Sequence, residues 1–249
     1  MRRTDEEFDE VKALCQTGLS DYEVARLCGV PRSTVQRWRR TQIRRSVFGP
    51  EPGWRPPVAP DYCHLLGVYL GDGWITTAGR SATLCVSLDK SYPDVVDETV
   101  SVIERTFPGT PVHRYTHRPG CVIVKTSHPS LPLAFPQYGP GRKHERLIEL
   151  VPWQQELTRT YPHRLLRGLI HSDGCRCSNR FKTLLPSGRV AEYEYPRYFF
   201  SNLSTDIRRI FCEHCELLGI RWTQSSPRNV SVSDRGSVAL LDSFVGPKR

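Results

Sequence analysis

Two short apolar segments that each end in Asp-Gly constrain the fold more than any other feature of the sequence. Residues 64–73 read HLLGVYLGDG and residues 165–174 read LLRGLIHSDG. Their apolar spacing predicts two helices, ending on Asp72 and on Asp173. An acid in the last turn of a helix is unfavourable beside the negative end of the helix dipole. One Asp-Gly ending is a common turn, but two of them, 101 residues apart, indicate an internal duplication.

The segments after these two helices repeat in the same order. In the first half, residues 82–89, 111–117 and 121–127 have strand patterns around a helix at 92–107. In the second half the expected elements are strands at 193–202, 221–226 and 229–234, and helices at 204–220 and 236–245. The sequence therefore predicts the α+β class: tandem, pseudo-two-fold αββαββα halves at about 61–150 and 151–249, each with an antiparallel sheet covered on one face by helices.

Small residues recur on one face of each of the two paired helices. Aligning the helices on their aspartates matches Gly67 with Gly168 and Gly71 with Ser172. Residues four apart share a helix face, and small residues there let two backbones approach closely. We therefore expect these four residues to form a helix–helix interface around the pseudo-two-fold axis, so that the chain is a monomer with internal symmetry.

That packing would bring Asp72 and Asp173 side by side. Neighbouring carboxylates repel each other, and one of them would ordinarily hold a proton. A divalent cation between them would remove the conflict, and the negative ends of two helix dipoles also favour a cation. Oxygen ligands suit Mg²⁺, which takes substrate phosphate oxygens as further ligands. The sequence thus predicts that Asp72 and Asp173 are the catalytic and metal-binding residues of a Mg²⁺ site.

Residues 1–40 predict a separate, small, all-α domain that binds DNA. Ser20 and Glu23 have the spacing of a capping box for a helix at 21–28 that ends at Gly29, and a second helix opens between residues 32 and 34. Two short helices around a tight turn indicate a helix-turn-helix, whose second helix enters the major groove. A generic three-helix packing unit is the alternative.

The second helix of this motif is strongly basic. Between Arg32 and Arg45 there are six arginines and no acid. The segment GVPRSTVQRW, residues 29–38, resembles the helix-turn-helix of resolvases and transposases. The expected DNA-binding residues are Arg32, Ser33, Thr34, Gln36, Arg37, Arg39, Arg40, Arg44 and Arg45. A Pro/Gly/Arg linker is expected at residues 41–60, because prolines and glycines disfavour regular structure there.

The charge of the chain also favours a polyanionic partner. The formal net charge is +9 at pH 7, and the partner that we expect is double-stranded DNA. No apolar run approaches the roughly 20 residues of a membrane span, and the first ten residues lack the apolar region of a signal peptide. We expect a cytoplasmic protein, nucleoid-associated when bound to DNA, without membrane contact.

The nine cysteines form two local clusters that could hold zinc. Four thiolates, Cys175 and Cys177 with Cys212 and Cys215, are a candidate structural zinc site. However, Cys-x-Cys is not the usual zinc spacing, and the second pair lies in a segment with helical apolar periodicity. We therefore favour reduced, mostly buried thiols over zinc.

The paired segments resemble the name motif of LAGLIDADG (dodecapeptide) homing endonucleases in their two-motif, single-chain form. The motif is represented by LLGVYLGDG at 65–73 and by LRGLIHSDG at 166–174. The lead-in RLIELVPWQQELTRTYPHR and the later FSNLSTDIRRIF are also similar to the family. The resemblance covers residues 61–249. The chain lacks the terminal residues that inteins use for splicing, so we expect a free-standing protein.

The resemblance implies a metal-dependent endonuclease. In this family the penultimate acid of each motif binds the catalytic metals, which corresponds to Asp72 and Asp173, and the sheets form a saddle for DNA. The sixth motif position, often acidic in the family, is Leu70 in one half and His171 in the other.

Three functions remain open at this stage. The first is a site-specific, Mg²⁺-dependent endonuclease of double-stranded DNA, such as a mobile element would encode. The second is a transcriptional regulator that has the LAGLIDADG fold without cleaving, and the third is an RNA-splicing maturase. The two acids favour the endonuclease, whereas the added helix-turn-helix favours the regulator.

Overall fold

The computed structural model describes residues 5–40, 53–78 and 81–248. The chain folds into two compact units, Met1–Phe48 and Gly49–Arg249. Residues 41–52 lie outside the described part, and with them Arg44, Arg45 and most of the predicted linker. Within the described residues, no helix has both the length and the apolar character that would be needed to cross a membrane.

The first unit consists of three helices: α1 (Asp5–Gln16), α2 (Asp21–Cys28) and α3 (Arg32–Arg40). The predicted capping box is confirmed, since the Ser20 side chain accepts from the Glu23 amide while the Glu23 side chain accepts from Ser20. Gly29 ends α2 in the left-handed conformation, with φ of 61°. A small core holds the three helices together; its buried members are Phe8, Val11, Val24, Val30, Val35 and Trp38.

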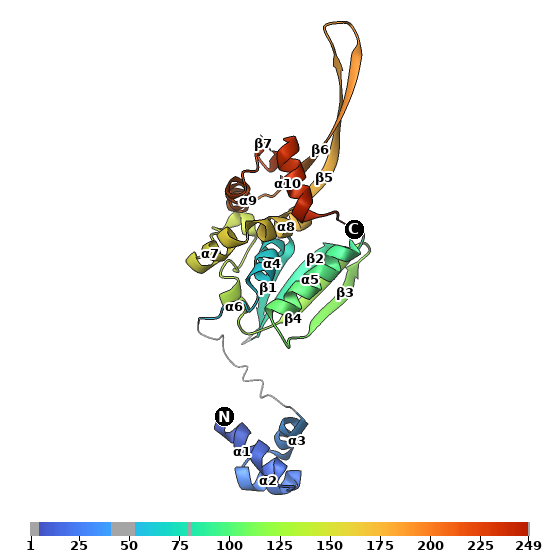
Figure 1. The fold of residues 1–249 in the computed structure, drawn as a ribbon. Helices are drawn as coiled ribbons and strands as arrows, with labels where there is room; N and C mark the ends of the chain where they lie inside the picture. Colours follow the sequence, from blue (N-terminus) through green and yellow to red (C-terminus); the bar gives the residue numbers. More distant parts are fainter. Residues whose placement is uncertain (1–4, 41–52, 79–80, 249) are drawn as a thin grey trace. The chain divides into compact units, whose positions relative to one another are not determined.

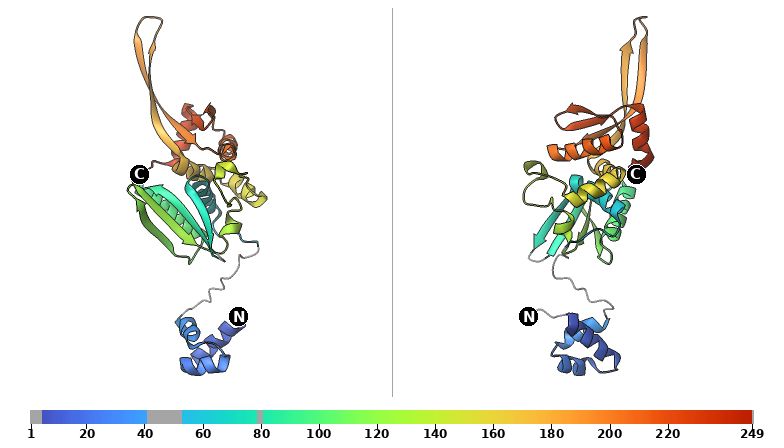
Figure 2. Two further views of the ribbon diagram at one scale, coloured as in Figure 1. Left: turned by 180° about the vertical axis from the view of Figure 1, so that it is seen from behind. Right: turned by 60° about the vertical axis from the view of Figure 1, so that its left-hand side comes forward.

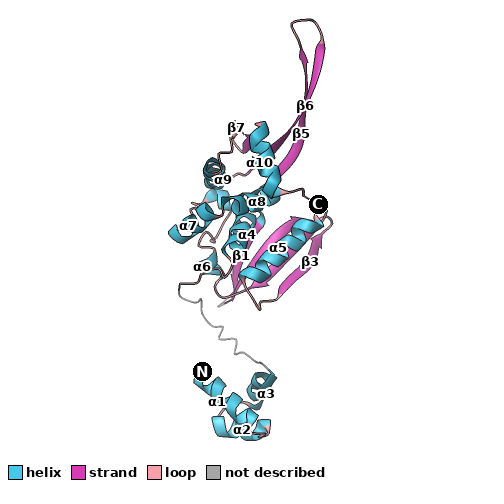
Figure 3. Cartoon of the chain, viewed as in Figure 1, coloured by secondary structure: helices cyan, strands magenta, loops and turns pink. Residues whose placement is uncertain are grey.

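The second unit contains the predicted duplication (Figures 1 and 3). Its first half consists of α4 (Ala59–Asp72), β1 (Gly73–Ala78), β2 (Ser81–Asp89), α5 (Pro93–Thr106), β3 (Val112–Arg118), β4 (Cys121–Ser127) and the short α6 (Leu131–Ala134). A single 3-10 turn, η1 (Lys143–Glu145), lies between the halves. The second half consists of α7 (Pro152–Thr160), α8 (Pro162–Asp173), β5 (Gly174–Leu184), β6 (Val190–Ser201), α9 (Thr205–Leu217), β7 (Thr223–Ser226), β8 (Asn229–Val232) and α10 (Arg235–Val245).

Each half forms its own four-stranded sheet, and the two sheets have the same strand order. The strand orders are β1-β2-β4-β3 and β5-β6-β8-β7, and the paired strands are antiparallel throughout. Helix α5 lies across one face of the first sheet, and α4 and α8 lie side by side between the two sheets (Figure 1). In the second half, Phe200 of β6 stacks on Phe211 of α9 with ring centroids 4.4 Å apart. The predicted α+β class and the repeated αββαββα order are confirmed.

The second unit begins earlier than the predicted linker boundary at residue 60. Trp54 is buried and stacks on Phe107, with ring centroids 5.4 Å apart, and packs edge-on against Tyr62. Ala59 and Pro60 already belong to α4, where a proline in the first turn leaves no amide unpaired. The Pro/Gly composition correctly disfavours regular structure, but it does not reveal that one aromatic side chain anchors the segment in the core.

The hairpin formed by β5 and β6 is longer than the sequence predicts. It extends beyond the other elements of the second unit (Figure 2), and its strands have 11 and 12 residues. Polar residues on both faces hide this strand pattern, because alternation is the signal of a half-buried strand. The hairpin is held by its ladder and by cross-strand pairs, including a ring stack of Phe181 on Tyr193 and the ion pair of Arg180 with Glu194.

Candidate active site

The helices α4 and α8 pack with almost no space between their backbones, at two glycines. A Cβ atom on Gly67 would lie 2.7 Å from the Leu169 amide nitrogen and would also collide with the carbonyl oxygen of Leu165. A Cβ atom on Gly168 would lie 2.9 Å from the Val68 amide nitrogen and would collide with the carbonyl of His64. Glycine at both positions is therefore a condition for this packing.

One turn further along, the second pair of small residues brings the helix ends together. Gly71 of α4 lies directly against the Ser172 side chain, and a Cβ atom on Gly71 would be 3.0 Å from Oδ2 of Asp173. The Ser172 hydroxyl donates within its own helix, to the carbonyl oxygens of Gly168 and Leu169, both at 3.0 Å. The carboxylate of Asp173 is thus seated against the last turn of α4.

The glycine after each aspartate is not a conventional helix cap. Gly73 has φ of −93° and Gly174 has φ of −108°, both extended rather than left-handed. Each helix passes directly into the first strand of its half. A Cβ atom would lie 2.7 Å from the α-carbon of Tyr69 at the first glycine and 2.8 Å from that of Ile170 at the second. The two Asp-Gly endings therefore differ from the ordinary turn, and the glycines are needed for a tight helix-to-strand junction.

The environment of the two carboxylates is electrostatically unfavourable for two negative charges. Burial raises the pKa of Asp72 to about 7, and the charge of Asp173 acts in the same direction. Burial also raises the pKa of Asp173, against a hydrogen bond that Asn202 donates to its Oδ2 at 2.5 Å. Two half-buried acids with raised pKa values are suited to hold a cation.

Two lysines that the sequence analysis did not select lie at the ends of these helices. The Lys143 ammonium donates to the carbonyl oxygens of Leu70 at 2.9 Å and Gly71 at 3.0 Å, and also to that of Tyr69. The Lys248 ammonium donates to the carbonyl oxygen of Gly174 at 2.5 Å. Cations at a helix C-terminus interact favourably with the dipole.

The two lysines occupy corresponding positions in the two halves. Lys143 follows Asp72 by 71 residues and Lys248 follows Asp173 by 75 residues. Burial lowers the pKa of Lys143 to about 8, against the charges of the two aspartates, which raise it. The sequence did offer a signal for these two lysines. Only six of the 35 basic residues are lysines, and two of them follow the motif acids at similar distances.

A cleft beside the acids is open to a larger ligand. Its volume is about 420 Å³, and it is lined by residues from both halves, among them Gly71, Trp74, Lys143, Asp173 and Asn202. Asn202, at the end of β6, was also missed by the sequence analysis, because nothing in its local pattern distinguishes it from a turn residue. The cleft therefore combines the Asp173 carboxylate with amide and ammonium groups at one place.

The first unit presents most of the predicted DNA-binding residues on one helix. Arg32, Ser33, Gln36, Arg37 and Arg40 are exposed on α3, and Thr34 is half-buried. These positions are spaced by three and four residues and so share the outward surface of the helix.

Arg39, another of the expected DNA-binding residues, is bonded inside the first unit. Its Nε donates to Oδ1 of Asp21 at 2.6 Å, and its two terminal nitrogens donate to the carbonyl oxygens of Cys15 and Leu19. The guanidinium therefore ties α3 to α1 and α2 through three hydrogen bonds within the unit.

The two cysteine clusters lie in different environments. Cys212 and Cys215 are buried on α9, as the helical periodicity predicts. Cys175 is exposed and Cys177 is half-buried, both on β5.

The raised pKa of Asp72 predicts a pH-dependent stability. The unfolded carboxyl has a pKa of about 3.8, whereas in the folded chain it is about 7. Between these values the folded state holds a proton that the unfolded state releases, so stability falls as pH rises from about 4 to about 7 and is level above that. With divalent cations removed by a chelator, Asp72→Asn should therefore stabilise the chain by about 4 kcal/mol at pH 8 and hardly at pH 4. Urea unfolding at both pH values measures this, and an equal gain at both contradicts it.

Comparisons with known proteins give the following similarities. Residues 10–45 match the family model of a homeodomain-like domain. No curated protein matches the sequence. Among solved structures, the LAGLIDADG meganuclease I-AabMI bound to uncleaved DNA has 12% identity and a TM-score of 0.47, with 74% of this chain and 82% of that chain covered. The structure of I-DmoI with DNA and Mn has 11% identity and a TM-score of 0.48, with 76% and 98% covered. The homing endonuclease I-WcaI bound to its DNA recognition sequence has 13% identity and a TM-score of 0.47, with 79% and 85% covered. The comparisons thus give a homeodomain-like match for residues 10–45 and, for LAGLIDADG homing endonuclease structures, similarities at 11–13% identity with TM-scores below 0.5.

Proposed function

We propose that the protein is a metal-dependent, site-specific endonuclease of double-stranded DNA. The observation that carries the proposal is the pair Asp72 and Asp173, half-buried at the ends of two helices that glycines hold in contact. Such a pair is unfavourable without a cation, and a merely structural helix pair has no need of two partly desolvated acids there. The motif resemblance at residues 65–73 and 166–174 supports the same reaction.

The residues of the site fit a hard divalent cation. Asp72 and Asp173 would hold it through carboxylate oxygens, with Mg²⁺ as the proposed ion. When bound, the ion would neutralise charge on the scissile phosphate and make a hydrolytic water more acidic. The acids must then be ionised, so the raised pKa of Asp72 makes ion binding weaker below about pH 7.

The other groups of the cleft position the phosphate and the acids. Asn202 donates to Asp173 and so fixes the orientation of that carboxylate. Lys143 and Lys248, held by carbonyl oxygens of the two helix ends, place positive charge beside the cleft. Ammonium groups there attract the DNA backbone and stabilise the charge that develops on it during hydrolysis.

We propose that residues 1–40 act as a tethered DNA-binding domain and residues 53–249 as the nuclease. The exposed residues of α3, including Arg32, Gln36 and Arg37, are placed to contact a duplex. The homeodomain-like match at residues 10–45 also supports a second function, that of a DNA-binding regulator which does not cleave.

The test is incubation of the purified chain with a library of DNA duplexes in Mg²⁺, scored separately for bound and for cut molecules. The endonuclease proposal expects cut duplexes that share one sequence and depend on the ion. Bound but uncut duplexes would support the regulator instead. A parallel incubation with structured RNA tests the maturase function, which would require that the chain binds RNA.

Removal of the first unit should weaken DNA binding without abolishing site preference. A chain that starts at residue 53 keeps Trp54 in the core of the second unit. We expect weaker binding and a salt dependence that is shallower by roughly one unit of slope per lost phosphate contact, because the two units bind one duplex at high effective concentration. Selected sites of the full and shortened chains are compared. If the shortened chain has no sequence preference, the first unit is the one that recognises the DNA sequence.

A further inference from the structure

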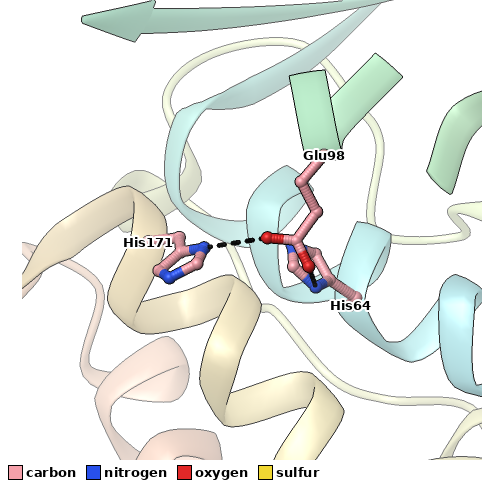
Figure 4. Close-up of side chains that lie close together, drawn as sticks. All are labelled: His64, Glu98 and His171. Atoms are coloured by element: carbon pink, nitrogen blue, oxygen red, sulfur yellow. Dashed lines mark ion pairs between the residues drawn. The ribbon is translucent and has the colours of Figure 1, made fainter. Parts of the chain in front are cut away.

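Three titratable side chains meet in the interior of the second unit, away from the cleft. His64 comes from α4, Glu98 from α5 and His171 from α8 (Figure 4). One ring nitrogen of each histidine and one carboxylate oxygen lie within 4.8 Å of one another. Nδ1 of His64 is 3.4 Å from Oε1 of Glu98, and Nδ1 of His171 is 3.6 Å from Oε2.

His64 is fully buried, and neither of its ring nitrogens has a hydrogen-bond partner among the described residues. Buried polar groups in folded proteins are nearly always paired, because an unpaired one loses its hydration without compensation. Apolar side chains would fill this position in the core more favourably. A histidine at this position therefore indicates that its ring nitrogen has a partner that is not a side chain of the described residues.

The second histidine presents a lone pair to the same carboxylate. Nε2 of His171 is 2.9 Å from the carbonyl oxygen of Val245, which can only accept, so Nε2 carries the proton. Nδ1 of the neutral ring is then unprotonated and faces Oε2 of Glu98, another acceptor. Two acceptors that face each other require a cation between them. Donation of the far ring N–H to a backbone carbonyl is also the arrangement that orients metal-binding histidines.

Burial lowers the pKa of His64 to about 3, so that ring is neutral at pH 7, which is the form that binds metals.

We propose that His64, Glu98 and His171 bind a Zn²⁺ ion that ties α4, α5 and α8 together. Ligand atoms bound at about 2.0–2.2 Å lie about 3.3–3.6 Å apart around a tetrahedral ion. The two nitrogen–oxygen separations, 3.4 and 3.6 Å, fall at these values and are too long for good hydrogen bonds. Imidazole nitrogens with one carboxylate form a ligand set that suits zinc better than magnesium.

Arg167 holds the carboxylate in place for this role. Its Nε donates to Oε1 of Glu98 at 2.8 Å and its Nη2 donates to Oε2 at 2.7 Å. Each carboxylate oxygen has a second lone pair, and this remains for the ion. The site does not depend on the proposed nuclease function, although His171 lies only half a turn before Asp173 on α8 and the ion would fix that part of the helix.

The test uses Co²⁺ as a spectroscopic substitute for Zn²⁺, in the full chain freed of metals and kept in excess Mg²⁺. We expect the absorption bands of four-coordinate Co²⁺ to saturate at one ion per chain and to disappear when Zn²⁺ is added. His64→Gln and His171→Gln should each weaken Co²⁺ binding at least about tenfold. His113→Gln, an exposed histidine on β3, and the double variant Asp72→Asn/Asp173→Asn should leave the bands unchanged.

Absence of the bands in the wild-type chain would overturn the proposal. So would bands that survive both histidine substitutions, or bands that vanish in the double aspartate variant. Circular dichroism checks that the variants fold. If the histidine variants do not fold, X-ray absorption of the wild-type Co²⁺ form decides, since it must show two imidazole ligands per ion, and fewer than two would refute the site.

Discussion

Asp72→Asn and Asp173→Asn should each abolish cleavage of duplex DNA, while DNA binding stays intact or becomes tighter. Each substitution removes a carboxylate ligand of the proposed ion, and an ion on the scissile phosphate supplies several kcal/mol of transition-state stabilisation. A loss of about 4 kcal/mol corresponds to a rate lower by roughly a thousandfold. Binding should not weaken, because a negative charge near the DNA phosphates is removed. Single-turnover cleavage and equilibrium binding, measured on the same duplex, give the two quantities.

A matched acid-to-amide change provides the control. Glu149→Gln alters an exposed acid in the segment before α7 and should cleave at the wild-type rate. If Asp72→Asn or Asp173→Asn also cleaves at that rate, the two acids do not hold a catalytic ion. That result would support the non-cleaving regulator, provided that the variants still bind DNA site-specifically.

Gly67→Ala and Gly168→Ala should each destabilise the second unit by about 3 kcal/mol or more. A single methyl group at either position would overlap backbone atoms of the facing helix, so α4 and α8 would have to separate. Separation also displaces Asp72 from Asp173, because the glycines lie on the same helices as the acids. Chemical unfolding of purified variants measures the change in the free energy of unfolding.

Gly139→Ala is the matched control for this prediction. A Cβ atom at Gly139 would have its nearest neighbour, Nη1 of Arg146, at 3.5 Å, an ordinary contact distance. Its effect should stay below about 1 kcal/mol. Wild-type stability in Gly67→Ala or Gly168→Ala would mean that the two helices do not pack as closely as described.

The features of this protein that can be predicted from the sequence are those with a local sequence pattern. Apolar periodicity and the Asp-Gly endings predict α4 and α8 to their last residue, and Ser20 with Glu23 predicts the start of α2. The duplication then gives the order of the remaining elements, because a repeated unit must build the same sheet twice. The acids of the candidate site and the glycines between their helices follow from the same alignment, since each lies at a fixed distance from the end of its helix.

The groups that only the tertiary structure brings together have no such pattern. Lys143 and Lys248 reach the two helix ends from segments far along the chain, and Asn202 reaches Asp173 from the end of a strand. The bond of Arg39 to Asp21 is also absent from the sequence pattern, because a basic side chain on a helix looks the same in sequence whether it faces solvent or a neighbouring acid.

The cluster of His64, Glu98 and His171 is the extreme case, since its three members come from three helices and from both halves. Periodicity reports which side of an element is buried, so the sequence by itself determined the two paired helices and the repeated order of the elements, but not the length of the β5–β6 hairpin. Which side chains converge depends on how those elements pack in space. Contacts between residues far apart in the chain produce no periodic pattern in the sequence.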